Sequence, residues 1–224
     1  MVGNLQRDTT LVGLANWPIV WTMKRFAIIM ALNPTFVTAQ EIIVTRGEKS
    51  IGLYVRMPYN DVPSFFGAEV QGFADADGTL ATDALFNGTF EQADALITYL
   101  SFAVGSENVA FEALSMMVHP PNSDLTFDTP LDAEIAIAVC GVPLPDGPIV
   151  DADLTWVAGW YAYPIDPEQD LTISFPATGR MTEVVEVTSF DGDTRLDTSN
   201  VTLADGGSLT LPYVGSRRWF SWLR

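Results

Sequence analysis

Alternation of apolar and polar residues dominates the chain from residue 40 onward and predicts its first element. The segment Glu41–Thr45 is apolar and β-branched, Arg46-Gly-Glu-Lys49 carries turn chemistry, and apolar residues alternate again over Ile51–Met57. Alternation with period two is typical of strands with one buried face, so this segment predicts a β-hairpin. Further strands are predicted at 125–127, 134–140, 154–163, 171–175, 185–187, 201–203 and 209–211.

One segment has helical rather than strand periodicity. Thr89-Phe-Glu-Gln92 matches the capping box that begins many helices. Apolar residues then follow at positions 93, 96, 97, 100 and 104, and Gly105 is a natural helix end. These signals predict one helix around residues 90–104. The next segment, 109–118, fits either a helix or a strand, and two prolines end it in both cases.

Short strands separated by regular turn signals are typical of an antiparallel β-sandwich. We therefore predict a mainly β fold, an antiparallel β-sandwich with the one helix packed on or beside it. The turn residues between 203 and 209 predict a hairpin of the last two strands. The Pro- and Gly-rich segment 143–150 is a linker or a crossover, so residues 40–142 and 151–224 form one sandwich or two small β-rich subdomains.

The run from Met23 to Ala39 resembles a secretory signal peptide. Two basic residues, Lys24 and Arg25, precede an apolar core, and Val37-Thr-Ala39 is a small-residue cleavage site. We expect translation to start at Met23 and the mature chain to begin near Gln40 in a secreted or periplasmic protein. Residues 1–22 are then an upstream extension outside the fold; the alternative is a structured N-terminal arm. The two charges argue against a membrane span at residues 17–37, and the mature chain predicts none.

Charge narrows the choice of partners. The chain has 11 basic and 28 acidic residues and a net charge of −17. Removing residues 1–39 takes away three basic residues and one acidic residue, which leaves −19. Between Met57 and Gly179 there is no Lys or Arg. Because phosphate binding requires basic side chains, we exclude nucleic-acid partners. Three explanations of the acidic surface remain: it keeps the protein soluble, it adapts the protein to a saline habitat, or it binds cations.

The metal-ligating residues are few. His119 and Cys140 are single residues of their types, which excludes an intramolecular disulfide and a zinc site of several N and S ligands. No cofactor is predicted other than calcium, which takes oxygen ligands. Asp-x-Asp pairs are also ordinary turn chemistry. The candidate calcium ligands are Asp75, Asp77, Asp151, Asp153, Asp191 and Asp193.

Catalytic motifs are missing from the sequence. It contains no Gly-x-Ser-x-Gly elbow, no Gly-x-Gly-x-x-Gly and no phosphate-binding loop. Paired carboxylates that would suit glycoside hydrolysis arise trivially among so many acids, so they carry no information. A non-catalytic protein is therefore favoured, and a small secreted hydrolase that uses two acids is the alternative.

Two aromatic groups are candidate contact surfaces. On a strand, Trp156 and Trp160 share one face, and Tyr161 and Tyr163 share the other. We predict that exposed rings among these four stack on a glycan; the alternative is that they fill the core between the sheets. The tail carries Arg217, Arg218, Trp219 and Trp222. It is either a final edge strand or a docking peptide for a membrane surface or a protein partner, as in an envelope assembly subunit. The expected function is binding or structural.

Overall fold

The computed structural model describes residues 40–68, 88–119, 123, 125–138, 154–179 and 182–214, all within one compact unit. The predicted extension at 1–22, the signal peptide at 23–39 and the linker at 143–150 lie outside the described residues.

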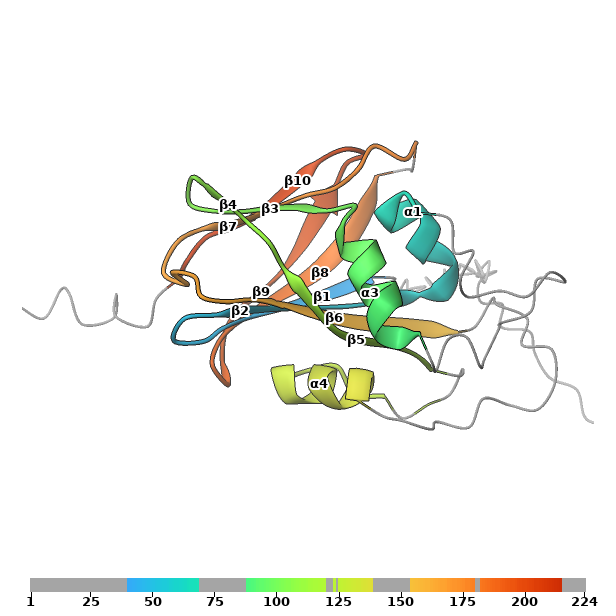
Figure 1. Cartoon of the computed structure of the whole chain (residues 1–224), viewed down its shortest axis with the longest axis horizontal. Helices are drawn as coiled ribbons and strands as arrows, with labels where there is room; N and C mark the ends of the chain where they lie inside the picture. The colour runs from blue at the N-terminus through green and yellow to red at the C-terminus, as the bar shows by residue number, and fades with distance from the viewer. Residues whose placement is uncertain are drawn as a thin grey trace, which may run out of the picture. The chain divides into compact units, whose positions relative to one another are not determined.

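The described chain forms two β-sheets (Figure 1), which confirms the mainly β, sandwich-like fold. The larger sheet has the strand order β5-β6-β2-β1-β8-β9. Strands β1 and β8 pair in parallel, and all other neighbouring strands of this sheet are antiparallel. Its strands are β1 (Gln40–Arg46), β2 (Ile51–Pro58), β5 (Glu112–His119), β6 (Thr155–Ala162), β8 (Glu183–Asp191) and β9 (Thr194–Leu203).

The smaller sheet is antiparallel and has the order β10-β7-β3-β4. Its strands are β3 (Ser101–Val104), β4 (Glu107–Val109), β7 (Leu171–Ser174) and β10 (Ser208–Leu211). Each sheet takes strands from both sides of segment 143–150, so the chain before and after this segment builds one sandwich rather than two subdomains.

The main core lies between the two sheets and includes one face of two helices. The helical elements are η1 (Tyr59–Asp61), α1 (Val62–Phe66), α3 (Thr89–Ile97) and α4 (Pro130–Ala138). Alternate residues of β1, β2 and β6 point into this core, together with Phe65 and Phe66 of α1 and Ala93 and Leu96 of α3. Burial of these side chains is the main force that holds the sheets together.

Helix α4 covers the other face of the larger sheet, opposite α3 and the smaller sheet (Figure 1). Ala133, Ala136 and Ile137 of α4 pack against Val157 and Tyr54 of the sheet. A strand was predicted at 134–140, and this prediction is wrong for the described part, because residues 130–138 are helical. Alternating Ile and Ala residues fit both periods, and the helix-starting signal before them decides between the two.

That signal is a cap at Thr129. Its hydroxyl accepts a hydrogen bond from the backbone N–H of Asp132 at 3.1 Å and donates to the carboxylate of Asp132 at 2.7 Å. Pro130 occupies the first helical position, where a missing N–H costs nothing. Thr-Pro-Leu-Asp therefore starts a helix, although the sequence pattern was interpreted as a turn between strands.

Three further predictions differ from the structure. Residues 125–127, predicted as a strand, lie in an irregular segment before α4. The helix predicted around 90–104 ends at Ile97, and residues 101–104 are strand β3. Gly88, not Thr89, is its N-cap, and no side chain caps it. The predicted hairpin of the last two strands is also wrong: β9 pairs with β8 in the larger sheet, whereas β10 pairs with β7 in the smaller one. The turn after Leu203 thus crosses between sheets.

Gly159 of β6 lies beneath α4 and leaves no room for a side chain. A Cβ atom at Gly159 would lie 2.8 Å from Ile137 Cδ1 and 2.9 Å from Tyr54 Cδ1. We expect Gly159→Ala to destabilise the protein by about 1–3 kcal/mol in urea unfolding, because the added methyl group overpacks this contact.

Gly47→Ala is the matched control. It adds the same methyl group, but the close neighbour there is the hydroxyl of Ser50, which can rotate away. We expect a change within about 0.5 kcal/mol. Equal unfolding free energies for the two variants would contradict the tight packing of α4.

Candidate functional site

The two tryptophans predicted to contact a glycan are core residues. Trp156 and Trp160 of β6 are 0% exposed. Phe66 packs against both indoles, with ring centroids 5.5 Å and 6.0 Å apart. The indole N–H of Trp160 also donates to the carbonyl oxygen of Ala93 in α3 at 2.8 Å. Neither indole has a free face for a sugar, so the alternative interpretation, filling of the inter-sheet core, describes them.

The two tyrosines of the same segment lie differently. Tyr161 is half-buried, and its hydroxyl donates to Glu112 Oε2 at 2.9 Å. This hydrogen bond raises the pKa of Tyr161. Tyr163 follows β6 and is 64% exposed. Glycan contact through these two side chains stays a prediction.

The described pair of candidate calcium ligands forms a turn. Asp191 and Asp193 flank Gly192 between β8 and β9. Gly192 has a φ of 56°, and its N–H donates to the carbonyl oxygen of Arg46 at 2.8 Å. Within the described ranges, no three His, Cys, Asp or Glu side chains gather as metal ligands. Asp75, Asp77, Asp151 and Asp153 lie outside these ranges.

The tail prediction is likewise untested. Arg217, Arg218, Trp219 and Trp222 lie outside the described residues, and so does Cys140. Docking through the tail therefore stays a prediction.

His119 has a structural environment. It is 2% exposed at the end of β5, and its Nε2 lies 2.8 Å from the carbonyl oxygen of Ala136 in α4. Nε2–H must donate here, because a carbonyl oxygen only accepts. Burial lowers the pKa of His119, although the bond to Ala136 works in the opposite direction. The side chain thus connects α4 to the sheet as a neutral imidazole.

A concavity with mainly apolar walls lies beside the end of α3, and we call it the α3–β4 hollow. It has a volume of about 470 Å³. Its apolar walls come from α3, the turn after it, β3, β4 and the segment before β5: Ile97, Leu100, Phe102, Val109 and Phe111. The rings of Phe102 and Phe111 lie 4.3 Å apart between centroids.

The rim of this hollow is polar but uncharged. Thr98, Ser101, Asn108 and Ala110 complete the described lining, and none of its nine described residues is ionisable. This composition contrasts with the strongly acidic chain. An uncharged, mainly apolar concavity of this size suits a small organic group.

Local sequence explains how the hollow forms. The Thr98 hydroxyl donates to the Ala95 carbonyl oxygen at 2.7 Å, close to the end of α3. The chain then turns into β3, and Gly105, with a φ of 59°, turns β3 back into β4. The sequence prediction missed this hollow because it continued the helix through residue 104. Alternation of Phe102 and Val104 before Gly105 was the available signal for a strand.

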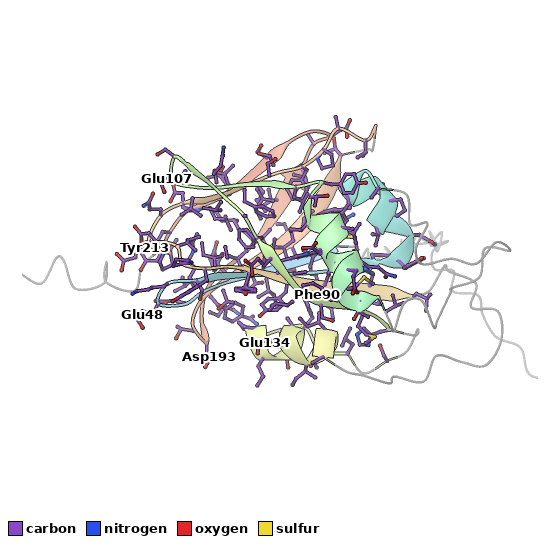
Figure 2. The ribbon with its side chains drawn as sticks, viewed as in Figure 1. Glu48, Phe90, Glu107, Glu134, Asp193 and Tyr213 are labelled. Atoms are coloured by element: carbon purple, nitrogen blue, oxygen red, sulfur yellow. The ribbon has the colours of Figure 1, made fainter. Side chains whose placement is uncertain are left out.

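A second concavity, of about 260 Å³, is polar and contains the buried guanidinium of Arg46. Glu48, Glu168, Asp191 and Tyr213 are among its lining residues. Glu48 and Tyr213 are labelled at one end of the structure in Figure 2.

The guanidinium is engaged by the protein itself. Nη1 donates to the carbonyl oxygens of Pro167 and Gln169, each at 2.7 Å, and Nη2 donates to that of Leu211 at 3.1 Å. Its carbon lies 5.6 Å from the centre of the Tyr213 ring. Burial lowers the pKa of Arg46, while Asp170 acts in the opposite direction. Because acidic residues surround it, this concavity does not suit an anion.

No protein-family model matches the chain, and neither does any curated protein sequence. In the described part of the chain, every helix is too short or too polar to cross a membrane.

The environment of His119 predicts the pH dependence of stability. Because its pKa is lower in the folded than in the unfolded chain, the unfolded chain binds the proton more readily below its ordinary value of about 6.5. The contribution of neutral His119 is complete above that pH and is lost as the pH falls. We expect the urea midpoint of the wild type to fall more than that of His119→Gln between about pH 7.5 and 5.5.

The variant comparison is needed because Asp61 acts in the opposite direction. Burial raises the pKa of its carboxyl group, so protonation of Asp61 favours the folded state. The His119 resonance gives a direct check in the folded protein, since the chain has one histidine. A titration midpoint at or above the ordinary value would contradict this account.

Proposed function

We propose that this chain is an exported, acidic, non-catalytic binding protein that takes an uncharged, largely apolar ligand group in the α3–β4 hollow. The observation that carries the proposal is the hollow itself. Its walls include two closely spaced phenylalanine rings, and the lining residues that the structure describes carry no ionisable group, on a chain with a net charge of −17. Removal of apolar ligand surface from water would supply the binding energy.

Export is supported by sequence rather than by geometry. The run at 23–39 has the three parts of a signal peptide in the right order. The acidic composition suits a protein that stays soluble outside the cell, because net charge of one sign opposes association.

Binding is favoured over hydrolysis by the chemistry of the two concavities. A hydrolase with paired acids would hold a carboxyl group of raised pKa in its cleft. Asp61 has a raised pKa, but it lines neither the α3–β4 hollow nor the concavity at Arg46. The α3–β4 hollow offers apolar contact and neutral hydrogen-bonding groups, which bind a ligand without activating it.

The lining also limits the ligand class. Phe102, Val109 and Phe111 favour a ring or a branched aliphatic group, whereas Thr98, Ser101 and Asn108 offer hydroxyl and amide partners at the rim. An anionic ligand would be repelled by the surrounding protein charge. A small neutral amphiphile fits these conditions best.

Blocking the hollow tests this proposal. Ala110 lines the hollow and is exposed, so Ala110→Trp places an indole there without disturbing the core. With the uncharged dye Nile red as probe, we expect saturable fluorescence enhancement by the wild type. Ala110→Trp should bind the dye at least about tenfold more weakly, as loss of roughly 1.4 kcal/mol of apolar contact would produce.

Ala204→Trp is the control. Ala204 is also an exposed alanine, but it lies in the turn after β9 and does not line the hollow. Its dye affinity should equal that of the wild type. Equal dye binding by both variants, or no saturable binding by the wild type, would contradict a ligand site in the hollow.

A further inference from the structure

Three oxygen-bearing side chains meet at the start of β1, and we call them the β1 corner: Gln40, Asp61 and Glu183. Gln40 is 1% exposed. Its side-chain nitrogen donates to Glu183 Oε2 at 2.5 Å, and the side chain also hydrogen-bonds to Asp61. Its amide oxygen, Oε1, is buried and has no hydrogen-bond partner among the described residues. A buried acceptor without a donor destabilises the fold, so it indicates a missing donor.

The electrostatics of the β1 corner point to the same kind of group. The β1 corner contains the carboxyl groups of Asp61 and Glu183. The pKa of Asp61 is raised mainly by burial and, to a smaller extent, by the charge of Glu183. The neighbouring cation, Arg56 of β2, is ion-paired with Glu41. Glu41 follows Gln40 on β1 and therefore points to the other face of the sheet, as does Glu186, its partner in register on β8. A positively charged hydrogen-bond donor would satisfy the corner.

Cleavage of the predicted signal peptide would create a positively charged donor next to this corner, at the backbone nitrogen of Gln40. The predicted cleavage site, Val37-Thr-Ala39, directly precedes Gln40. In the parallel register of β1 and β8, Gln40 pairs with Val185, two residues after Glu183. The backbone nitrogen of Gln40 therefore lies at the end of β1 where the acidic side chains gather. As an ammonium group, this nitrogen would carry a positive charge and three N–H donors.

We propose that cleavage between Ala39 and Gln40 creates the cation of the β1 corner, so that the new α-ammonium group pairs with Asp61 and Glu183 and stabilises the exported chain. The inference rests on the proposed export. An endopeptidase uses one water molecule: the Ala39–Gln40 amide bond breaks, the hydroxyl group goes to the carbonyl carbon of Ala39, and the hydrogen goes to the nitrogen of Gln40. That amine then takes a further proton from solvent.

The first experiment separates the two proposals. The full chain is expressed in an exporting bacterium, and the N-terminus of the exported protein is read by mass spectrometry. We expect a free Gln40. A protein that is not exported, or that keeps Met1 or Met23, would overturn export itself. A cut at another residue, or a Gln40 cyclised to pyroglutamate, would leave export standing and overturn only the inference about the β1 corner.

The second experiment measures the pairing in the processed protein. Isotope-labelled methylation of the α-amine allows its titration by NMR. We expect its pKa to lie above the ordinary range of about 7.7–8.0 and to return toward that range in Glu183→Gln. Glu186→Gln, which removes the same charge from the other face of β8, should leave it unchanged. An ordinary value in the wild type would overturn the inference.

Thermal stability gives an independent readout with opposite signs for the two outcomes. If the α-ammonium is paired in the corner, Glu183→Gln lowers the midpoint at neutral pH, by about 2–4 °C for one lost interaction. If no cation is present, the same change relieves repulsion from Asp61 and the midpoint stays or rises. Because a raised amine pKa stabilises only below that pKa, the difference should close as the pH rises through it. A midpoint that depends on added calcium instead would overturn the proposal.

Discussion

Burial of the Arg46 guanidinium between the ends of the two sheets is the constraint on which the fold depends most. Arg46 is the last residue of β1 in the larger sheet. Its guanidinium donates to Leu211, the last residue of β10 in the smaller sheet, and to Pro167 and Gln169 in the connection from β6 to β7. Removing such an ion from water costs several kcal/mol. Arg46 is only 3% exposed, so this cost is offset only when the carbonyl oxygens of Leu211 and of the β6–β7 connection converge on it. The relative position of the sheets is fixed there by hydrogen-bond geometry rather than by apolar packing alone.

The packing of the core and the position of α3 depend on this contact between the sheets. With the sheets held together, Trp156 and Trp160 fill the space under α1 and α3, and the bond from Trp160 to Ala93 sets the position of α3. The end of α3 then faces the β3–β4 hairpin across the α3–β4 hollow. The proposed ligand site thus depends on buried aromatic residues that themselves never touch the ligand.

Much of this could be predicted from the sequence, and the errors have physical causes. The β1–β2 hairpin and strand β6 were visible because their alternation or continuous apolar character is local. Helix α4 was missed because its cap at Thr129 resembles a turn, and strand β3 was missed because Leu100 and Val104 extend a helical stripe. The role of Arg46 could not be found locally, because its partners lie more than 120 residues along the chain. The burial of Trp156 and Trp160 could not be predicted either, because it depends on how distant strands and helices pack, which no short sequence pattern contains.

Substitution of Arg46 tests this account most directly. Arg46→Met keeps an unbranched apolar stem but removes every hydrogen bond to the carbonyl oxygens of Pro167, Gln169 and Leu211. We expect urea unfolding of this variant to show a loss of at least about 3 kcal/mol in the free energy of unfolding, since charged donors contribute roughly 1.5–3 kcal/mol each. Arg46→Lys should recover only part of this loss, because an ammonium group lacks the planar fork of the guanidinium group. A loss below about 1 kcal/mol for Arg46→Met would contradict this account.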